Sequence, residues 1–273
     1  MPSPHLGRRN ARLVAAALLL SAVAYTAWVL EVVLSTGLDP VQAYISELAA
    51  EDQPLGGLFR ATDLVAGLAV LTAAVTALLA ARSTGRRTGE PVAGTSGARS
   101  PGAARGPWVV TGWAALAVFG AATAADSRLP LSCAPTSDEM CAARETAGLV
   151  PATHTAHAVT SSLAMTGALG GLVALTVAAR RHGWWPPVRR YGPWLLAGEL
   201  LATGWSLAAI AAFEAGRGTW SLGAGQRLQV LLVAIWLAVL AASLARDGRE
   251  RAAEEQPAGR AARRAHAEGA EPR

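Results

Sequence analysis

Long apolar stretches alternate with polar segments along the chain, and the lengths of these stretches predict helices that cross a membrane. A helix needs about 20 mostly apolar residues to span the roughly 30 Å hydrocarbon layer. Six stretches meet this requirement: residues 12–36, 61–81, 108–125, 154–179, 194–213 and 226–245. We therefore expect an all-α integral membrane bundle of six transmembrane helices that occupies residues 12–246, after a short N-terminal segment, 1–11.

The composition of the chain supports this fold class. Hydrophobic residues make up 52% of the chain and charged residues 16%, whereas a soluble domain has roughly 25% charged residues. All 24 basic residues are arginine, which together with abundant alanine and glycine indicates a GC-rich bacterial genome. The net charge is +5, but the arginines lie between the apolar stretches rather than on one face, so we expect no nucleic-acid partner.

The distribution of arginine predicts the orientation of the bundle. Arg8 and Arg9 precede the first stretch, five arginines lie between the second and third stretches, and four lie between the fourth and fifth. The alternate connections hold one or two arginines each. Because basic residues stay on the cytoplasmic side, we expect a multi-pass protein of the plasma (inner) membrane with both ends in the cytoplasm.

Two cytoplasmic segments are expected to lack stable structure. Residues 83–106 consist mainly of Gly, Thr, Ser, Pro and Arg, the composition of a flexible linker. The tail, 247–273, mixes Arg and Glu with Ala and is expected to be disordered or a frayed helix. Neither segment carries a chemical motif.

The first segment on the outside predicts a short helix. Asp39 and Pro40 suit an N-cap and a first helical turn. Apolar residues then recur at the spacing of one helix face, at Val41, Tyr44, Ile45 and Leu48. We expect an amphipathic helix on the outer leaflet that ends near Pro54, with Ser46 and Glu47 folded back over the bundle. Its simplest role would be to shield the end of the bundle.

The only two cysteines, Cys133 and Cys141, share the second segment on the outside. The space outside the plasma membrane is oxidising, which favours a disulfide between them. Two thiols without a CxxC spacing are less suited to a metal site. We therefore predict a disulfide that closes a short loop.

Polar residues gather at the outside ends of the predicted helices. His154 and His157 are three positions apart, so both lie on one helix face, which Ser161 extends. Asp126 ends the preceding stretch, and antiparallel packing places it at the depth of His154; Asp63 opens the second stretch at that depth. The other stretches bring further polar groups to this level: Glu31, Glu214, Gln226, Arg227 and Gln229.

Three interpretations of these residues stay open. Ionisable groups at membrane depth are costly and indicate function, yet side chains near the interface can snorkel, and an Asp–His hydrogen bond could simply lock the helix ends together. A second interpretation is a catalytic or metal centre in which His154, His157 and Asp126 bind zinc or a similar metal. A third is a pathway for a ligand or an ion.

Several short motifs occur in the order and spacing of a known family: YISELAAEDQP at 44–54, LFRATD at 58–63, DSRLPLSCAP at 126–135, HTAH at 154–157 and GQR at 225–227. Over residues 11–246 the chain resembles domain-of-unknown-function family 998. These are bacterial multi-span membrane proteins thought to be distantly related to the Frag, DRAM and Sfk membrane proteins. The resemblance implies a six-helix bundle and no established activity.

A looser similarity concerns membrane hydrolases of the alkaline-ceramidase type, which place histidines, an aspartate and a serine around zinc at one end of a helical bundle. The possible counterparts, by residue type alone, are His154, His157, Asp126 and Ser46. The chain departs from that pattern because it lacks a seventh span and a third histidine on the outside. A carboxylate such as Asp126 or Glu47 would have to take the place of that histidine.

These observations favour a membrane protein that binds a lipid, a partner subunit or a second copy of itself through its outside face. The alternative is a metal-dependent hydrolase or transferase that acts on a lipid of the outer leaflet, with Glu47 or Asp63 as general base and Ser46 as a further catalytic group. Arg227 and Gln226 would then bind the substrate. A small transporter ranks third, because no proline interrupts an expected span. Whether the chain is an enzyme stays open.

Overall fold

The computed structural model describes residues 6–87 and 106–268, and those residues contain helices and no strand. The α-helices of this part are α1 (Arg8–Tyr25), α2 (Gly56–Arg87), α3 (Pro107–Asp126), α4 (Glu139–Thr146), α5 (Ala152–His182), α6 (Pro186–Glu214) and α7 (Leu222–Glu268). Two 3₁₀-helices accompany them, η1 (Ala27–Val32) and η2 (Ile45–Ala49). Six of the helices, all except α4, are long and apolar enough to cross a membrane. The expected all-α fold with six spans is confirmed, and the chain is a multi-pass membrane protein.

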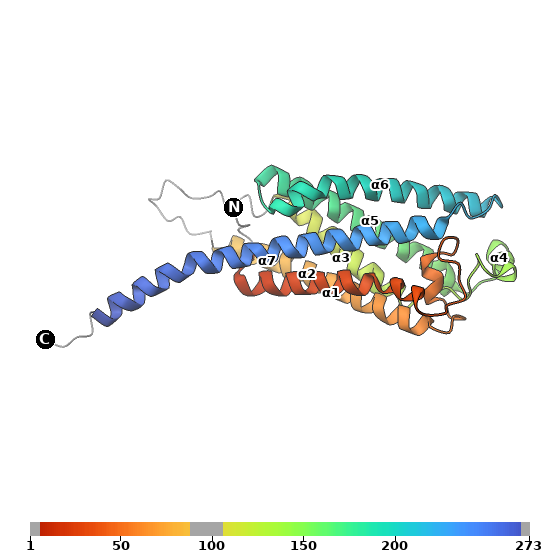
Figure 1. Cartoon of the computed structure of the whole chain (residues 1–273), viewed down its shortest axis with the longest axis horizontal. Coiled ribbons are helices and arrows are strands. Elements are labelled where there is room, and N and C mark those ends of the chain that lie inside the picture. Colours follow the sequence, from red (N-terminus) through yellow and green to blue (C-terminus); the bar gives the residue numbers. More distant parts are fainter. Residues whose placement is uncertain (1–5, 88–105, 269–273) are drawn as a thin grey trace.

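The six long helices form a closed ring. Neighbours in this ring are α1 and α2, α2 and α3, α3 and α5, α5 and α6, α6 and α7, and finally α7 and α1. Consecutive long helices run in opposite directions, so the loops that carry η2 and α4 gather at one end of the bundle (Figure 1). We call this end the loop end. The opposite end is the arginine end, because Arg8, Arg82, Arg180 and Arg190 lie near the helix termini there.

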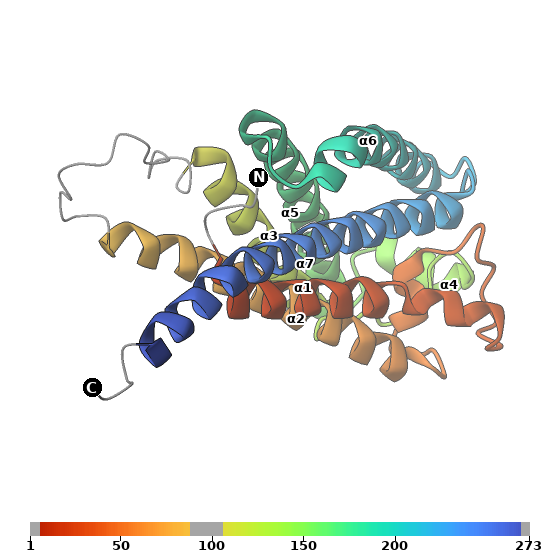
Figure 2. The same ribbon diagram turned by 60° about the vertical axis from the view of Figure 1, so that its left-hand side comes forward.

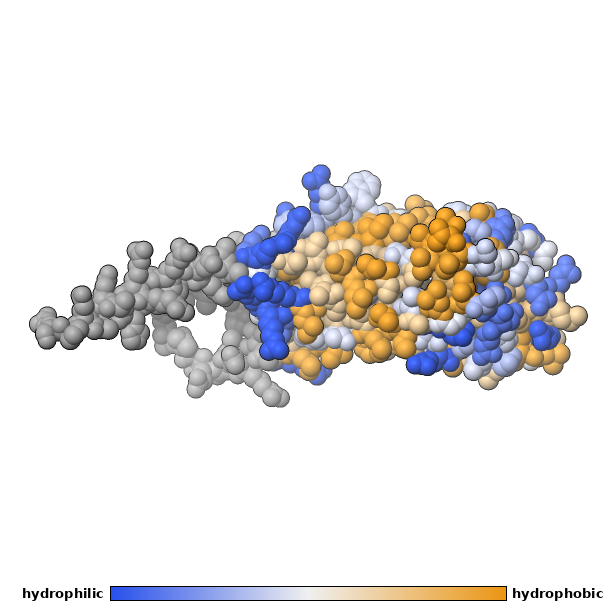
Figure 3. All heavy atoms as spheres, turned by 60° about the horizontal axis from the view of Figure 1, so that its bottom comes forward, coloured by the Kyte–Doolittle hydropathy of each residue, from blue (hydrophilic) through white to orange (hydrophobic). Residues whose placement is uncertain are grey.

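The surface of the bundle carries a wide apolar band. Figure 3 shows this band on one face, with hydrophilic residues on both sides of it. On α6, Leu201 and Leu207 are 75% and 62% exposed. Large aliphatic side chains that are exposed over such an area are suited to contact with lipid and not to contact with water.

Glycines allow α2, α3 and α5 to pack with their backbones in contact. A Cβ atom on Gly67 of α2 would lie 2.6 Å from the backbone nitrogen of Ala124 in α3. A Cβ atom on Gly167 of α5 would lie 2.6 Å from the backbone nitrogen of Phe119 in α3. Small residues at helix interfaces are a common basis of association in membranes. These three helices therefore form the most closely packed part of the ring.

Two helices are longer than the hydrophobic pattern predicts. α6 begins at Pro186 rather than near residue 194, and therefore contains Pro193. The expectation that no span contains a proline is wrong, because proline is tolerated at helix N-termini and in membrane helices. α7 continues beyond residue 245 to Glu268, so of the two forms expected for the tail, residues 247–268 take the helical one. The Ala, Glu and Arg residues of this tail are strong helix formers, and they extend a helix that already exists.

The expected linker falls mostly outside the described residues. Residues 83–87 continue α2, whereas 88–105 are outside the described part, as are 1–5 and 269–273. The first span also differs in detail from its expected form, because its α-helix ends at Tyr25 and the chain continues as η1 to Val32.

The expected amphipathic helix after Asp39 is wrong. The Asp39 carboxylate does accept a hydrogen bond from the backbone nitrogen of Val41, at 2.8 Å. However, the backbone leaves the helical region at Tyr44 (ψ 141°), and only the short η2 follows. The apolar spacing was therefore not sufficient to predict a continuous helix here.

Hydrogen bonds with the first turns of α7 explain this difference. A helix over 39–54 would need its own backbone groups for bonds along the helix, but here several of these groups pair with α7. Three such bonds are Ala224 N to Val41 O (3.1 Å), Arg227 Nη1 to Ala43 O (2.9 Å) and Ile45 N to Gln226 Oε1 (2.9 Å).

Candidate functional site

A cavity of about 450 Å³ lies inside the ring at the loop end. All six membrane-spanning segments and η2 contribute to its lining. Of the eight residues predicted to be catalytic, metal-binding or substrate-binding, five line the cavity: Ser46, Asp63, Asp126, His157 and Gln226. Three others are not among its lining residues, namely Glu47, His154 and Arg227. The structure therefore divides the predicted site residues into two groups.

Asp126, His157 and Ser161 form a hydrogen-bonded cluster on the cavity wall. Asp126 ends α3, and His157 and Ser161 lie one turn apart on the antiparallel α5. His157 Nδ1 lies 3.1 Å from Asp126 Oδ1 and 3.0 Å from the Leu129 carbonyl oxygen. Ser161 Oγ donates to Asp126 Oδ2 at 3.0 Å and lies 3.3 Å from His157 Nε2. Thr160 Oγ1 donates to the same carboxylate, so Asp126 has partners on α5 for both of its oxygens.

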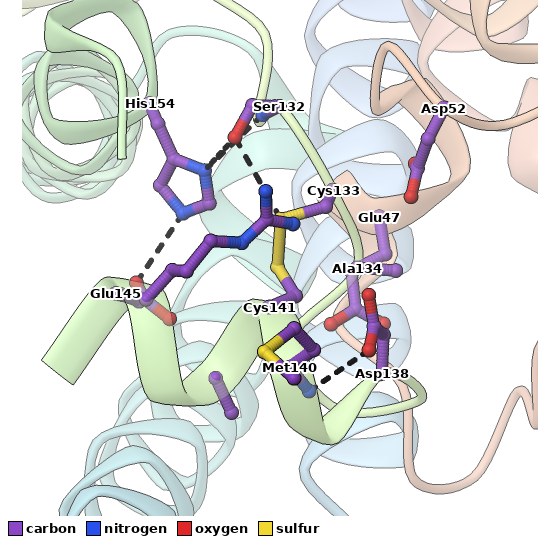
Figure 4. The surroundings of a disulfide bond; sticks show 12 residues. Glu47, Asp52, Ser132, Cys133, Ala134, Asp138, Met140, Cys141, Glu145 and His154 are labelled. Carbon is purple, nitrogen blue, oxygen red and sulfur yellow. Dashed lines mark hydrogen bonds and ion pairs between the residues drawn. A yellow bond between two sulfur atoms is a disulfide. The ribbon is translucent and has the colours of Figure 1, made fainter. Parts of the chain in front are cut away.

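His154 is directed toward Ser132, in the loop that precedes α4, and toward Glu145 of α4 (Figure 4). Its Nδ1 accepts a hydrogen bond from Ser132 N at 3.1 Å. Its Nε2 lies 3.4 Å from Glu145 Oε1, a distance that allows an ion pair but without hydrogen-bond geometry. Over the described residues, no three His, Cys, Asp or Glu side chains are placed to hold one metal ion. The expected zinc ligands His154, His157 and Asp126 are thus not brought together around one point.

Glu47 is buried and binds a neighbouring loop, and it does not line the cavity. Its carboxylate accepts hydrogen bonds from Thr136 N at 2.8 Å and from Thr136 Oγ1 at 2.5 Å. Thr136 lies in the loop closed by Cys133 and Cys141, whose disulfide is present as predicted (Figure 4). Burial raises the pKa of Glu47 to about 7, although the Thr136 hydrogen bonds and the charge of Arg227 oppose this shift. Glu47 therefore joins η2 to the disulfide loop, and its position does not support a role as general base in the cavity.

Arg227 and Glu31 form a buried ion pair. Arg227 Nε and Nη2 lie 2.6 and 2.7 Å from the two oxygens of Glu31, and the two side chains are 7% and 4% exposed. Two parallel bonds of this kind are a strong arrangement. Arg227 Nη1 also donates to the carbonyl oxygens of Ala43 and Gly223. Arg227 therefore connects α7 to η1 and to the segment before η2, and these contacts do not support the expectation that it binds the substrate.

Asp63 lines the cavity and, within the described part of the chain, makes no hydrogen bond or ion pair. Arg60 lies one turn before it on α2, but its guanidinium donates to the carbonyl oxygens of Ala49 (2.6 Å) and Ala50 (3.2 Å). The nearest basic side chain on α2 is thus directed to the loop. Asp63 is left facing the cavity without a positive partner.

Several lining residues were missed in the sequence, and Tyr25, Trp28 and Thr123 are three of them. Trp28 Nε1 and Thr123 Oγ1 are buried and have no hydrogen-bond partner in the described part of the chain. Tyr25 donates to the sulfur of Met165 at 3.8 Å. A signal for them existed, because Tyr25 and Trp28 are three positions apart near the end of the first span. Thr123 likewise lies three positions before Asp126, so it shares that helix face.

The cavity reaches the surface on one side of the ring. Its exposed lining residues all belong to α4, α5 or α6: Glu145, Ala158, Ser162, Leu207 and Glu214. Among neighbours in the ring, α5 and α6 make the least extensive contact, and Figure 2 shows them diverging from their connection. Ser162 is about 15 Å along α5 from its start at the loop end, so the opening extends into the apolar band.

Comparison with known proteins identifies one family model that matches the chain. Its description is "Protein of unknown function (DUF998)", and it matches residues 14–98 and 92–243, from the first long helix to the last. A comparison with curated proteins finds no match, and neither does a comparison with solved structures. The function has to be derived from the cavity itself.

Proposed function

We propose that this chain, which belongs to the DUF998 family as its motifs predicted, binds a lipid or a similar amphiphile in the loop-end cavity. One observation carries the proposal: the cavity opens toward the apolar band, and polar groups of its lining have no partner among the residues that the structure describes. These groups are Asp63, Trp28 Nε1 and Thr123 Oγ1. Unpaired polar groups at membrane depth cost free energy, and a polar headgroup would offset that cost.

The size of the cavity fits a headgroup and not a whole phospholipid. Its volume of about 450 Å³ lies in the range of roughly 300–1,000 Å³ found for small-molecule sites. The acyl chains would lie outside, between α5 and α6, where Leu207 of α6 is exposed. Such a lipid would not need to leave the bilayer in order to bind.

Two independent features support an outside location for the loop end. Arginines cluster at the opposite end of the helices, as on the cytoplasmic side of membrane proteins. The Cys133–Cys141 disulfide lies at the loop end, and disulfides persist in oxidising compartments. The ligand would therefore come from the outer leaflet of the plasma membrane.

Photocrosslinking in a reconstituted bilayer tests the proposal. A phospholipid with a photoactivatable group on its acyl chain should label the α5 and α6 walls of the opening, around Met165 and Leu207. Ala158→Trp places a large ring in the opening and should lower this labelling several-fold. Val159→Trp is the matched control, because Val159 is 59% exposed and does not line the cavity. Labelling spread evenly over the apolar band of the wild type would refute the proposal.

A second candidate function is hydrolysis of the bound lipid, which the contacts from Ser161 to His157 and from His157 to Asp126 favour. A hydroxyl, an imidazole and a carboxylate in that order are the groups of an acyl-transfer site. Against this function, Ser161 Oγ also donates directly to Asp126. A fluorophosphonate probe should label the wild type and Ser162→Ala but not Ser161→Ala. No labelling of the wild type would exclude a serine nucleophile of this kind.

A further inference from the structure

We infer that the ligand of the loop-end cavity carries a cationic amine, which Asp63 binds, and an oxygen atom that accepts a hydrogen bond from the cavity wall. This inference rests on the proposed function and names the chemical class of the amphiphile. An ethanolamine phospholipid has both groups, and so does a long-chain amino alcohol.

The position of Asp63 is the first argument. Asp63 lies about 10 Å along α2 from its start at the loop end, at a depth where an ionised carboxylate needs a positive partner. Arg60 does not provide one, because it donates to the carbonyl oxygens of Ala49 and Ala50. A cationic amine in the cavity would supply the missing partner.

The charge of the whole lining is the second argument. Four carboxylates line the cavity: Asp63, Asp126, Glu145 and Glu214. The basic residues of the lining are Arg60, which is bound to the loop, and His157, which is bound to Asp126. An anionic headgroup would therefore meet like charges with no free cation among the described lining residues. A cationic headgroup would meet opposite charges.

The uncharged part of the lining fits the same ligand. Tyr25, Trp28 and Tyr44 line the cavity, and aromatic rings attract ammonium groups. Trp28 Nε1 can only donate a hydrogen bond and has no acceptor within residues 6–87 and 106–268. The ligand therefore needs an acceptor oxygen as well as its amine, and the Thr123 hydroxyl is a second group free to bind it.

Three photoactivatable lipids in phosphatidylglycerol nanodiscs test this inference on the full chain. The first is phosphatidylethanolamine, and the second is the same lipid with an acetylated amine, in which a small neutral amide replaces the cation. Phosphatidylethanolamine should label the cavity lining about tenfold more strongly, the effect of one charged hydrogen bond. The third, sphinganine, has an amine and hydroxyls but no phosphate. Where phosphatidylethanolamine labels more strongly than its acetylated form, stronger labelling by sphinganine identifies an amino alcohol as the source of the amine, and weaker labelling identifies a phospholipid.

Variants of Asp63 test whether this residue causes the preference for the amine. Asp63→Asn should remove the difference between the amine and its acetylated form, whereas Asp63→Glu should retain it. Glu51→Gln is the control, because Glu51 is exposed at the loop end and does not line the cavity. If Asp63→Asn does not fold, as judged by its thermal unfolding, the comparison of lipids on the wild type still decides whether the cavity selects a cationic amine.

The outcomes separate this inference from the proposed function. Equal labelling of the lining by the amine and its acetylated form overturns the inference and leaves lipid binding intact. An amine preference that survives in well-folded Asp63→Asn also overturns it, because Asp63 would then not be the counter-ion. Absence of labelling in the lining with all three lipids overturns both.

Discussion

Removing the guanidinium of Arg227 should destabilise the bundle strongly, because Glu31 would stay buried without its partner. The Glu31 side chain is only 4% exposed. Breaking a buried pair by removing one member costs about 3–5 kcal/mol. For a protein of this size, each kcal/mol corresponds to about 2–4 °C in the unfolding midpoint. We therefore expect Arg227→Met, which keeps most of the side-chain volume, to lower the midpoint by about 6–20 °C.

Tryptophan fluorescence of the detergent-solubilised protein, followed at a fixed heating rate, measures this midpoint. Trp236 on α7 is fully buried and reports on the helix that carries Arg227. The double variant Glu31→Gln, Arg227→Met tests the physical reason, since it removes both charges and leaves no buried ion. It should regain at least about half of the lost stability. A double variant as unstable as Arg227→Met would show that the unpaired carboxylate is not the source of the loss.

Three further predictions concern packing, pH and topology. Gly120→Val should lower the stability of the folded protein by about 1–3 kcal/mol, because a Cβ atom there would lie 2.5 Å from a backbone nitrogen of α2. Gly204→Val is the control, because Gly204 has open space around it, and it should have little effect on the unfolding midpoint. The pKa of Glu47 is raised from 4.5 to about 7 in the folded state, so the folded protein holds this proton more tightly. The stability of the folded protein should fall by up to about 3 kcal/mol as pH rises from 4.5 to 7 and then level off. Glu47→Gln should remove this dependence of stability on pH. An equal dependence in the variant would show that Glu47 is not its source. A reporter enzyme that is active only outside the cytoplasm should be active when fused after Asp138 and inactive after Gly183, and the reverse pattern would invert the proposed orientation.

The sequence was sufficient to predict the features that depend on local composition and on helix geometry. Six spans follow from the length of each apolar stretch, a property that needs no knowledge of neighbours. The contact between Asp126 and His157 follows from two consecutive antiparallel helices with polar residues at equal depth. The disulfide follows from two cysteines in one loop.

The failures arise where the outcome depends on groups far apart in the chain. The segment after Asp39 has helical spacing, yet α7, about 180 residues later in the sequence, pairs with its backbone and prevents a continuous helix. His154 shares a helix face with His157, but its ring is directed toward Ser132 and Glu145 of the loop region. The direction of a side chain at a helix end is decided by the loops that cover it, and hydrophobic periodicity does not encode those loops.

The role of Arg227 also could not be predicted from its local sequence. Its position at the start of an apolar stretch indicates only a polar group at the interface. Its role depends on Glu31, which lies in η1 after the end of α1. The pairing could be anticipated only by knowing that α1 and α7 are neighbours.

The contact between α1 and α7 has a consequence for biosynthesis. Helices enter the membrane in chain order, so α1 waits in the bilayer until α7, the last long helix of the ring, has been made. During that interval Glu31 lacks Arg227, and the cavity lacks the wall that carries Gln226 and Gln229. The cavity therefore does not mature gradually with each added helix. It comes into existence in one step, when insertion of α7 closes the ring.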